Sequence, residues 1–116
     1  GFQMTIQELG TISQYKIPVK MVLLNNDFLG MVRQWQQLFF EKRYSFTEMT
    51  NPDFIKIAEG YGVPGKRITE RSELTGALKE MYECEGPYLL EIAVEKEENV
   101  FPMVPSGDSV ANIRLD

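Results

Sequence analysis

The chain has 116 residues, enough for one domain with a hydrophobic core but not for several. Hydrophobic residues make up 43% of it and charged residues 25%, as in ordinary globular proteins. Its 12 basic and 17 acidic residues give a net charge of −5, which argues against nucleic acid or an anionic membrane as the main partner. Histidine is absent, and this excludes Ser-His and Cys-His nucleophile pairs and the usual zinc ligands.

The remaining global features exclude other classes of protein. The single cysteine, Cys84, cannot form a disulfide within the chain, and its place in a helical pattern favours a buried, inert thiol. No run of residues approaches transmembrane length, and no signal peptide is visible. An apolar segment starts directly at Gly1 without an initiator methionine, so we expect the sequence to begin inside a domain.

Apolar residues at regular spacing mark the first elements of the fold. Residues 5–15 predict a helix that carries Ile6, Leu9 and Ile12 on one face. The almost wholly apolar run 19–24 is typical of a strand that is buried on both faces in a parallel sheet.

A second helix is predicted soon after that strand, over about residues 30–40. The strand stops at Asn25 and Asn26, and the helical pattern begins a few residues later. A buried strand that turns sharply into a helix places the turn at the carboxyl edge of the sheet, where open α/β folds bind ligands. The residues expected on the inward face of this helix are Met31, Trp35, Leu38 and Phe39.

The residues of this turn suit a cation and a phosphate. Asn25 and Asn26 offer neutral amide oxygens to a hard cation such as Mg²⁺. Gly30 lets the backbone approach a ligand closely, and the helix has no acidic residue before Glu41, so its positive end is open to an anion. The alternative is an Asn-Asn-Asp turn that serves only as a cap.

The middle of the chain predicts a loop and a third helix. Residues 41–50 are polar and aromatic without a clear period, which indicates a loop or an extended lid. Asn51, Pro52 and Asp53 form a strong helix start, with a cap, a proline at the first position and an acid in the first turn. Gly62 is expected to end this helix. Its inward face should hold Phe54, Ile57, Ala58 and Tyr61.

Two more strands and one more helix complete the pattern. The strands are predicted at 63–69 and 88–94, on either side of a helix over about 71–84 that Gly86 and Pro87 terminate. The order αβααβαβ predicts an α/β fold, a parallel sheet with helices on both faces. The inward residues of the last helix should be Leu74, Ala77, Leu78 and Met81.

The end of the chain differs in composition from the rest. Residues 95–98 are charged and are expected to be a solvated exit from the last strand. Residues 100–116 contain prolines and a glycine, which indicates a tail that is ordered only where other protein supports it. We therefore expect a domain over 1–95 and a C-terminal tail over 96–116.

Several segments resemble a known family, in the same order and over nearly the whole chain. Residues 1–9 resemble the continuation of the Gly-Asp-Gly motif of thiamine-diphosphate enzymes, and Asn25-Asn26 resembles the pair that closes it. The pair alone indicates only the superfamily, whereas the Gly-Met-Val-x-Gln-Trp run is more specific to the catalytic subunit of acetohydroxyacid synthase (acetolactate synthase). The segments similar to that subunit are Gly30-Met31-Val32, Gln34-Trp35-Gln36, Asn51-Pro52-Asp53-Phe54 and Pro102-Met103.

This resemblance implies a partial thiamine-diphosphate-binding fold, with 1–95 as the C-terminal part of the cofactor domain. It implies that Asn26 binds Mg²⁺ through its side chain and Phe28 through its main-chain carbonyl. The third protein ligand of the family, the aspartate of Gly-Asp-Gly, would precede this sequence. Gly1 and Phe2 would lie beside the diphosphate.

The resemblance also implies roles for the second helix. Leu29, Gly30 and Met31 would lie along the diphosphate, and Met31 would also face the thiazolium and the substrate. Trp35 resembles the tryptophan that shapes the pocket for the second substrate, although a core aromatic one turn after Met31 has the same spacing. Asp27 and Arg33 are expected to be surface or turn residues.

The reaction implied is decarboxylation of pyruvate on thiamine diphosphate, followed by transfer of the two-carbon unit to a second 2-oxo acid in branched-chain amino acid biosynthesis. The cofactor carries the hard chemistry, and the protein orients it. The glutamate that activates the cofactor comes from another domain of a neighbouring subunit in the family, and Glu8 is expected to be structural instead. We therefore expect no catalytic residue within the chain and no activity from the chain alone.

The implied partners are pyruvate and 2-oxobutanoate, a second copy of the longer enzyme in a homodimer or larger oligomer, and a regulatory subunit in some members. FAD belongs to the longer enzyme, and no site for it is recognisable in these residues. The compartment expected is the bacterial cytoplasm, or an organelle in a eukaryote. Nucleic acid and membrane are not expected partners.

Other functions fit the same residues. A related thiamine-diphosphate carboligase or decarboxylase, such as a glyoxylate carboligase or a catabolic acetolactate synthase, shares the cofactor motif. Trp35 at one helical turn from Met31 favours the biosynthetic type. A non-catalytic binding or regulatory module that keeps the fold is the alternative from a different class, and the intact Asn25-Asn26 and Gly30-Met31 argue against it.

Overall fold

The computed structural model describes residues 1–116, and these form two compact units. The first, which we call the sheet unit, contains Gly1–Asn26 and Thr50–Val94. The second, the α2 unit, contains Asp27–Met49 and Glu95–Asp116. Apart from short 3₁₀ turns, the helices and strands follow one another in the predicted order αβααβαβ.

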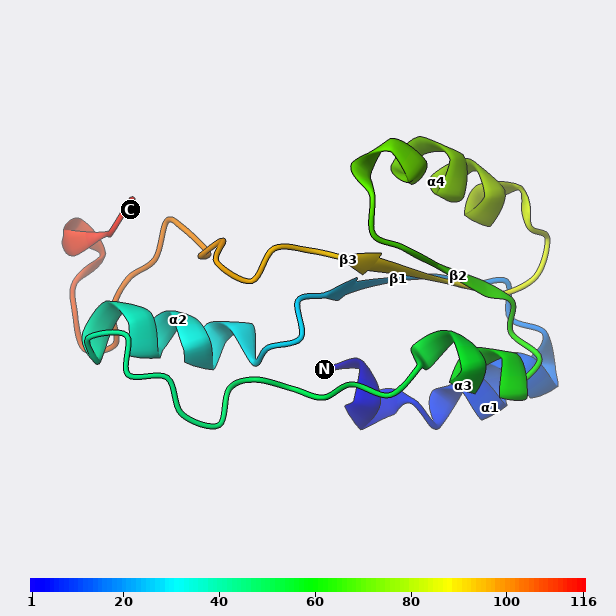
Figure 1. Cartoon of the computed structure of the whole chain (residues 1–116), viewed down its shortest axis with the longest axis horizontal. Helices are drawn as coiled ribbons and strands as arrows, with labels where there is room; N and C mark the ends of the chain where they lie inside the picture. The colour runs from blue at the N-terminus through cyan, green and yellow to red at the C-terminus, as the bar shows by residue number, and fades with distance from the viewer. The chain divides into compact units, whose positions relative to one another are not determined.

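The sheet unit is built on three parallel strands, which confirms the predicted α/β class (Figure 1). The strands are β1 (Lys20–Asn25), β2 (Gly65–Ile68) and β3 (Tyr88–Ala93), in the spatial order β1-β3-β2. β3 occupies the centre because its residues, apart from Glu91, are apolar toward both faces of the sheet. All three strands run in the same direction, so their carboxyl ends lie at one edge.

Helices cover both faces of this sheet. Figure 1 shows α1 (Glu8–Tyr15) and α3 (Phe54–Gly60) on one side and α4 (Leu74–Glu83) on the other. Successive residues of β3 point to opposite faces, so the sheet separates two hydrophobic clusters. The buried residues of the first cluster are Leu9, Phe54, Ala58, Val63 and Leu89. Those of the second are Ile68, Ala77, Met81, Tyr88 and Leu90.

β1 is only half covered, so the prediction of a strand buried on both faces was wrong. Met21 and Leu23 pack toward the α1–α3 side, but Val22 is 47% exposed and Leu24 is 63% exposed. β1 is an edge strand, and α4 packs over β2 and β3 instead. An apolar run in the sequence predicts a buried strand without indicating whether a helix covers each face.

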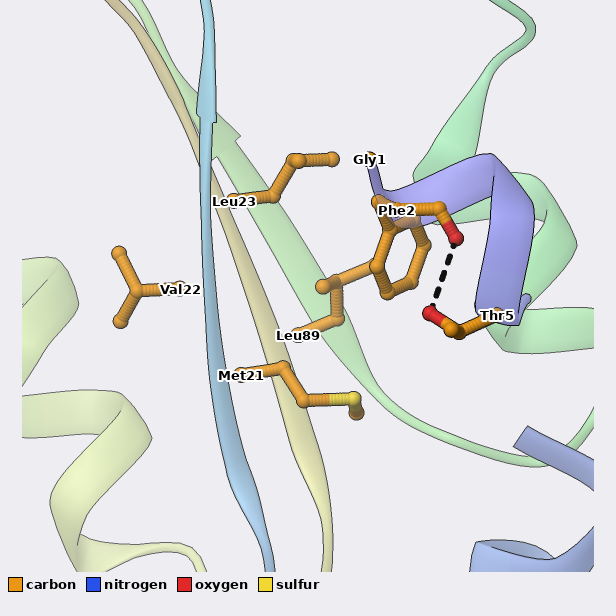
Figure 2. A pocket seen from close by; sticks show the side chains of 7 residues that line it. All are labelled: Gly1, Phe2, Thr5, Met21, Val22, Leu23 and Leu89. Carbon is orange, nitrogen blue, oxygen red and sulfur yellow. Dashed lines mark hydrogen bonds between the residues drawn. The ribbon is translucent and has the colours of Figure 1, made fainter. Parts of the chain in front are cut away.

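A cavity of about 380 Å³ lies on the covered side of β1. Figure 2 shows Met21, Leu23 and Leu89 pointing into it toward the ring of Phe2, while Val22 points to the opposite side of the strand. The Phe2 ring also packs edge-on against Phe54, with 5.5 Å between ring centroids.

Several helix boundaries differ from the predicted ones. The first predicted helix, over 5–15, begins only at Glu8, and a separate 3₁₀ turn at Phe2–Thr5 precedes it. The last predicted helix, over 71–84, is divided into a 3₁₀ turn at Arg71–Glu73 and α4. A capping box between Glu70 and Glu73 fixes the second of these turns.

Four predictions about single residues in the sheet unit were wrong. Tyr61, expected on the inward face of α3, is 39% exposed and follows the end of that helix. The N-cap of α3 is Asp53, whose Oδ1 accepts a hydrogen bond of 3.0 Å from the Lys56 amide, and not Asn51. Leu78 is 38% exposed, because α4 turns only Ala77 and Met81 fully inward. Cys84, which follows the end of α4, is only partly buried.

Glycines stand where the backbone requires them. Gly62 has a φ of 73° just after α3, which confirms that it ends this helix. At Gly65 a Cβ atom would lie 2.7 Å from the carbonyl oxygen of Leu89, so only glycine lets β2 pair with β3 at this point.

The α2 unit contains one α-helix, α2 (Gly30–Phe39), and a 3₁₀ turn at Val110–Asn112. Residues 41–50 contain neither helix nor strand, as predicted for a loop. Near the C-terminus, Met103 and Arg114 form an isolated antiparallel bridge. None of the helices in either unit combines the length and apolar character needed to cross a bilayer.

Candidate functional site

At the carboxyl end of β1, hydrogen bonds of both the main chain and the side chain hold the last residue, Asn25. Asn25, the last residue of β1, is 9% exposed, and its carbonyl accepts a hydrogen bond from the amide of Val94 at 3.0 Å. Its Nδ2 donates to Oε1 of Glu91 at 2.8 Å, and its Oδ1 accepts from Nδ2 of Asn51 at 3.0 Å. Protein groups therefore hold both ends of the Asn25 amide.

The next two residues make the turn. Asn26 is partly buried and is the last residue of the first segment of the sheet unit. Asp27 is exposed and has a φ of 55°, a left-handed conformation that aspartate and asparagine tolerate better than most residues. The prediction that Asp27 is an exposed turn residue is confirmed.

In the α2 unit, the segment before the helix is held against the end of the 41–49 loop. Phe28 forms an isolated antiparallel bridge with Glu48, and the amide of Leu29 donates to the carbonyl of Thr47 at 2.8 Å. The cationic groups of Arg33 and Lys96 each lie 5.5 Å from the centroid of the Phe28 ring. These contacts fix the backbone of Phe28 and Leu29 relative to α2.

The N-terminus of α2 keeps the character expected from the sequence. Its first turn contains no acidic residue, and no side chain makes a cap hydrogen bond at the N-cap, Leu29. Leu29 and Met31 are exposed, and Gly30 starts the helix without a side chain. The positive end of the helix dipole is therefore not neutralised by a carboxylate of the same turn.

The faces of α2 differ from the prediction at several positions. Met31 is 51% exposed and Phe39 is 38% exposed, whereas Arg33 and Gln34 are buried. The predicted inward positions of Met31 and Phe39 and the predicted surface position of Arg33 were wrong, whereas Trp35 and Leu38 are partly buried. The periodicity of apolar residues correctly indicates a helix, but it does not indicate which of them are covered.

The buried polar side chains of α2 are paired, as buried polar groups in proteins generally are. Arg33 lies 4.7 Å from the Tyr44 ring centroid and 3.7 Å from the carboxylate of Glu97. Gln34 accepts a hydrogen bond of 2.8 Å from the amide of Val100 and donates one of 3.1 Å to its carbonyl. α2 thus anchors the segment that follows residue 94.

The remaining predicted site residues divide between the two units. Gly1 is exposed and Phe2 is partly buried, and both line the cavity of the sheet unit (Figure 2). Trp35 lies one turn after Met31 on α2, partly buried, with 5.0 Å between its ring centroid and that of Phe39.

The donors available in the chain suit a hard cation only in part. No three His, Cys, Asp or Glu side chains gather in a way that would hold a metal ion. The side-chain oxygen of Asn26 and the main-chain oxygen of Phe28 are neutral donors of the kind that Mg²⁺ accepts together with water and phosphate oxygens. Each of these residues offers one such donor, and other ligands would be needed to complete a magnesium–phosphate site.

Comparison with known proteins decides the family. Residues 1–92 match the family described as "Thiamine pyrophosphate enzyme, C-terminal TPP binding domain". The chain belongs to this family. A thiamine pyrophosphate enzyme domain agrees with the three-stranded parallel sheet and with the strand-to-helix turn after Asn25.

The relatives of this thiamine pyrophosphate enzyme domain include acetolactate synthases. It is 50% identical over 110 residues to the acetolactate synthase isozyme 2 large subunit of Escherichia coli (strain K12), covering 94% of this chain and 20% of that protein. It is 49% identical over 110 residues to the mitochondrial acetolactate synthase catalytic subunit of Saccharomyces cerevisiae, covering 95% of this chain and 16% of that protein. The resemblance to acetolactate synthase catalytic subunits is therefore confirmed.

A solved structure of the same superfamily has a similar fold. The thiamine diphosphate-dependent 4-hydroxybenzoylformate decarboxylase of Rhodococcus jostii RHA1 matches with a TM-score of 0.76 and 30% sequence identity, over 84% of this chain and 19% of that one. The thiamine pyrophosphate enzyme domain spans a fifth or less of the length of the curated relatives named above.

The sequence did not predict which side chains form hydrogen bonds with Asn25. Glu91 is an acidic residue inside the apolar run of β3, and such a residue needs a partner when it is buried. An acidic residue within an apolar strand was therefore the one feature of the sequence that could have indicated this contact. Asn51 was assigned to a helix cap, and its contact with Asn25 could not be predicted without the fold.

Proposed function

We propose that the chain forms the C-terminal part of the cofactor domain of an acetolactate synthase catalytic subunit. The proposed enzyme decarboxylates pyruvate and transfers the two-carbon unit to a second 2-oxo acid, pyruvate or 2-oxobutanoate. The observation that carries this proposal is the identity of 50% over 94% of the chain to an acetolactate synthase large subunit. In this proposal residues 1–95 belong to the cofactor domain and 96–116 form its C-terminal tail.

We assign the cofactor-binding residues within this proposal. Asn26 would bind Mg²⁺ through its side chain and Phe28 through its carbonyl, both neutral oxygen donors. Gly1, Phe2, Leu29, Gly30 and Met31 would lie along the diphosphate. The uncapped first turn of α2, which has no acidic residue, supports an anion at that position.

Thiamine diphosphate, when bound, supplies the stabilisation of negative charge that decarboxylation of a 2-oxo acid requires. The residues of this chain would bind and orient it. Met31 and Trp35 would shape the substrate pocket, and the exposed side chain of Met31 is available for such a contact. No side chain of the chain is assigned as a proton donor or acceptor.

Further features of the proposed enzyme lie outside this chain. FAD would bind to other parts of the longer protein, and the active form would be a homodimer or larger oligomer, in some cases with a regulatory subunit. The proposed compartment is the bacterial cytoplasm, or an organelle if the source is eukaryotic.

The test uses the full-length protein that contains this sequence. It is incubated with pyruvate, thiamine diphosphate and Mg²⁺, and acetolactate is measured against a reaction without thiamine diphosphate. Cofactor-dependent formation of acetolactate is the expected result. Conversion of pyruvate to acetaldehyde and CO₂ without acetolactate would overturn the synthase assignment.

A second candidate function is a thiamine-diphosphate-dependent decarboxylase or another carboligase, such as a glyoxylate carboligase. It is favoured by the fold similarity to the Rhodococcus decarboxylase. Release of CO₂ from other 2-oxo acids, or carboligation of glyoxylate, without acetolactate formation would support it. A protein that binds the cofactor and consumes none of these acids would be a non-catalytic module.

A further inference from the structure

A chain of polar side chains runs along the α1–α3 side of the sheet unit to the carboxyl end of β1. Nε2 of Gln3 donates to Oδ1 of Asn51 at 3.2 Å, and Nδ2 of Asn51 donates to Oδ1 of Asn25 at 3.0 Å. Nδ2 of Asn25 donates to Oε1 of Glu91 at 2.8 Å. Nε of Arg67 lies 3.8 Å from the same oxygen.

Glu91 is the unusual member of this chain. It is 2% exposed and lies in the central strand between Leu90 and Ile92, where an apolar residue would serve the sheet at least as well. Burying a carboxylate costs free energy unless hydrogen bonds and opposite charge compensate it. Here the compensation comes from the Asn25 amide and from Arg67.

A carboxylate does one thing at this position that an apolar residue cannot do. Oε1 of Glu91 accepts a hydrogen bond from the NH₂ group of Asn25, which no apolar side chain can do. Glu91 therefore sets which end of the Asn25 amide faces β3. The oxygen is directed to Asn51, and the main-chain carbonyl of Asn25 is already held by Val94.

We propose that Glu91, together with Asn51, is a positioning residue for the metal–diphosphate site: by fixing the side chain of Asn25 it holds the backbone from which the Asn26 ligand departs. This inference rests on the proposed function, in which Asn26 binds Mg²⁺. One peptide unit separates Asn25 from Asn26, so rotation of the fixed residue would displace the ligand. A ligand held before the metal arrives binds it more tightly than one that must be ordered on binding.

The test measures metal binding directly, in the full-length protein freed of cofactor. Mg²⁺ is titrated calorimetrically in the presence of saturating thiamine diphosphate, and the concentration of Mg²⁺ for half-maximal activity is measured in parallel. Glu91→Met replaces the carboxylate with an apolar side chain of similar length. It should weaken Mg²⁺ binding by up to about 10-fold, the lower end of the range for groups that bond directly to a metal ligand, because Glu91 acts through Asn25. The kcat at saturating Mg²⁺ should change much less.

Two further variants test which property of Glu91 matters and whether Asn51 has the same role. Glu91→Gln can still accept from Asn25 through its Oε1, so its Mg²⁺ affinity should lie close to the parent value. Asn51→Ala removes the donor on the other end of the Asn25 amide and leaves the β3 core intact. It should weaken Mg²⁺ binding in the same direction as Glu91→Met, and it tests the proposal if Glu91→Met does not fold.

A matched control and the opposite outcomes complete the experiment. Glu80→Met removes another carboxylate with a side-chain partner from the same unit, on α4, and should leave Mg²⁺ affinity unchanged. Parent-like affinity in both Glu91→Met and Asn51→Ala would overturn the positioning role while leaving the proposed function standing. A parent protein that binds neither Mg²⁺ nor thiamine diphosphate would overturn the proposed function, and this inference with it.

Discussion

The hydroxyl of Tyr88 donates a hydrogen bond of 2.7 Å to Oε1 of Glu80. Nζ of Lys66 bonds to the other carboxylate oxygen at 3.1 Å, so one side chain of α4 is joined to both β3 and β2. The Tyr88 hydroxyl and, next, Lys66 hold the pKa of Glu80 below its ordinary value of 4.5. Burial, followed by the carboxylate, raises the pKa of Tyr88.

Tyr88→Phe should lower the free energy of unfolding at neutral pH by an amount that depends on pH. A carboxyl group with a depressed pKa in the folded state stabilises the fold above its unfolded pKa, and this contribution is lost as the pH falls through the folded pKa. The difference between parent and variant should therefore be full at pH 7 and shrink below about 4.5. Urea unfolding at several pH values measures it. Tyr82→Phe, at an exposed tyrosine of α4, is the control, and a difference that persists at pH 3 would contradict the prediction.

Asn26→Ala in the full-length protein should raise the concentrations of Mg²⁺ and thiamine diphosphate needed for half-maximal activity. Loss of a direct ligand should cost at least as much as loss of an outer-shell partner, which is about 10-fold to 100-fold. Activation curves for both cofactors measure the effect, with Asn112→Ala in the tail as the control. Curves that coincide with those of the parent would show that Asn26 only makes the turn.

Trp35→Leu should change the choice of acceptor more than the decarboxylation of pyruvate. Pyruvate and 2-oxobutanoate differ by one methylene, which a shaped pocket discriminates by about 1–3 kcal/mol. The product ratio from a competition between the two acids is the measurement. Phe46→Leu, at an exposed aromatic of the same unit, should leave the ratio unchanged. An unchanged ratio in Trp35→Leu would assign the indole to packing against Phe39 alone.

The 116-residue chain alone should form no acetolactate from pyruvate with thiamine diphosphate and Mg²⁺ added. In the proposed function Asn26 and Phe28 would supply only part of the metal ligands, and no group of three acidic, histidine or cysteine side chains could hold the metal by itself. The assay compares the purified chain with a reaction that lacks protein. Acetolactate above that background would show that these residues suffice for the chemistry.

The isolated chain should also self-associate through β1. This strand has a neighbour on one side only, and its exposed Val22 and Leu24 form an apolar face beside the open edge. Leu24→Lys should reduce association, measured by light scattering at tens of micromolar. Val110→Lys, at an exposed apolar residue outside the sheet, should not. A parent chain that stays monomeric would refute this prediction.

The sequence predicts the order of elements well because each one has a strong local signal. The apolar runs of β1 and β3, the glycine after α3 and the break at Gly86 depend only on neighbours along the chain. It fails where burial depends on residues distant in sequence. Val22 has the hydrophobicity of a core residue, but its exposure depends on where α4 packs.

In the candidate site, too, local features could be predicted from the sequence and contacts between distant residues could not. The turn after Asn25 and the uncapped start of α2 follow from residue types and spacing. The partners of Asn25 come from positions 51 and 91, and no periodicity links them. Arg33 shows the converse case, since a charged residue was expected at the surface, and four side chains of its own unit accommodate it inside: Phe28, Gln37, Tyr44 and Glu97.

The amide of Gln34 behaves toward Val100 as a peptide group of a neighbouring strand would, accepting from its N–H and donating to its C=O. Both hydrogen bonds involve only main-chain atoms of Val100, and its side chain is exposed. The residue at position 100 can therefore be replaced without loss of these two hydrogen bonds, except by proline, which lacks the N–H. The constraint falls on position 34, where even glutamate would lose the donor and leave two carbonyl-type acceptors facing each other.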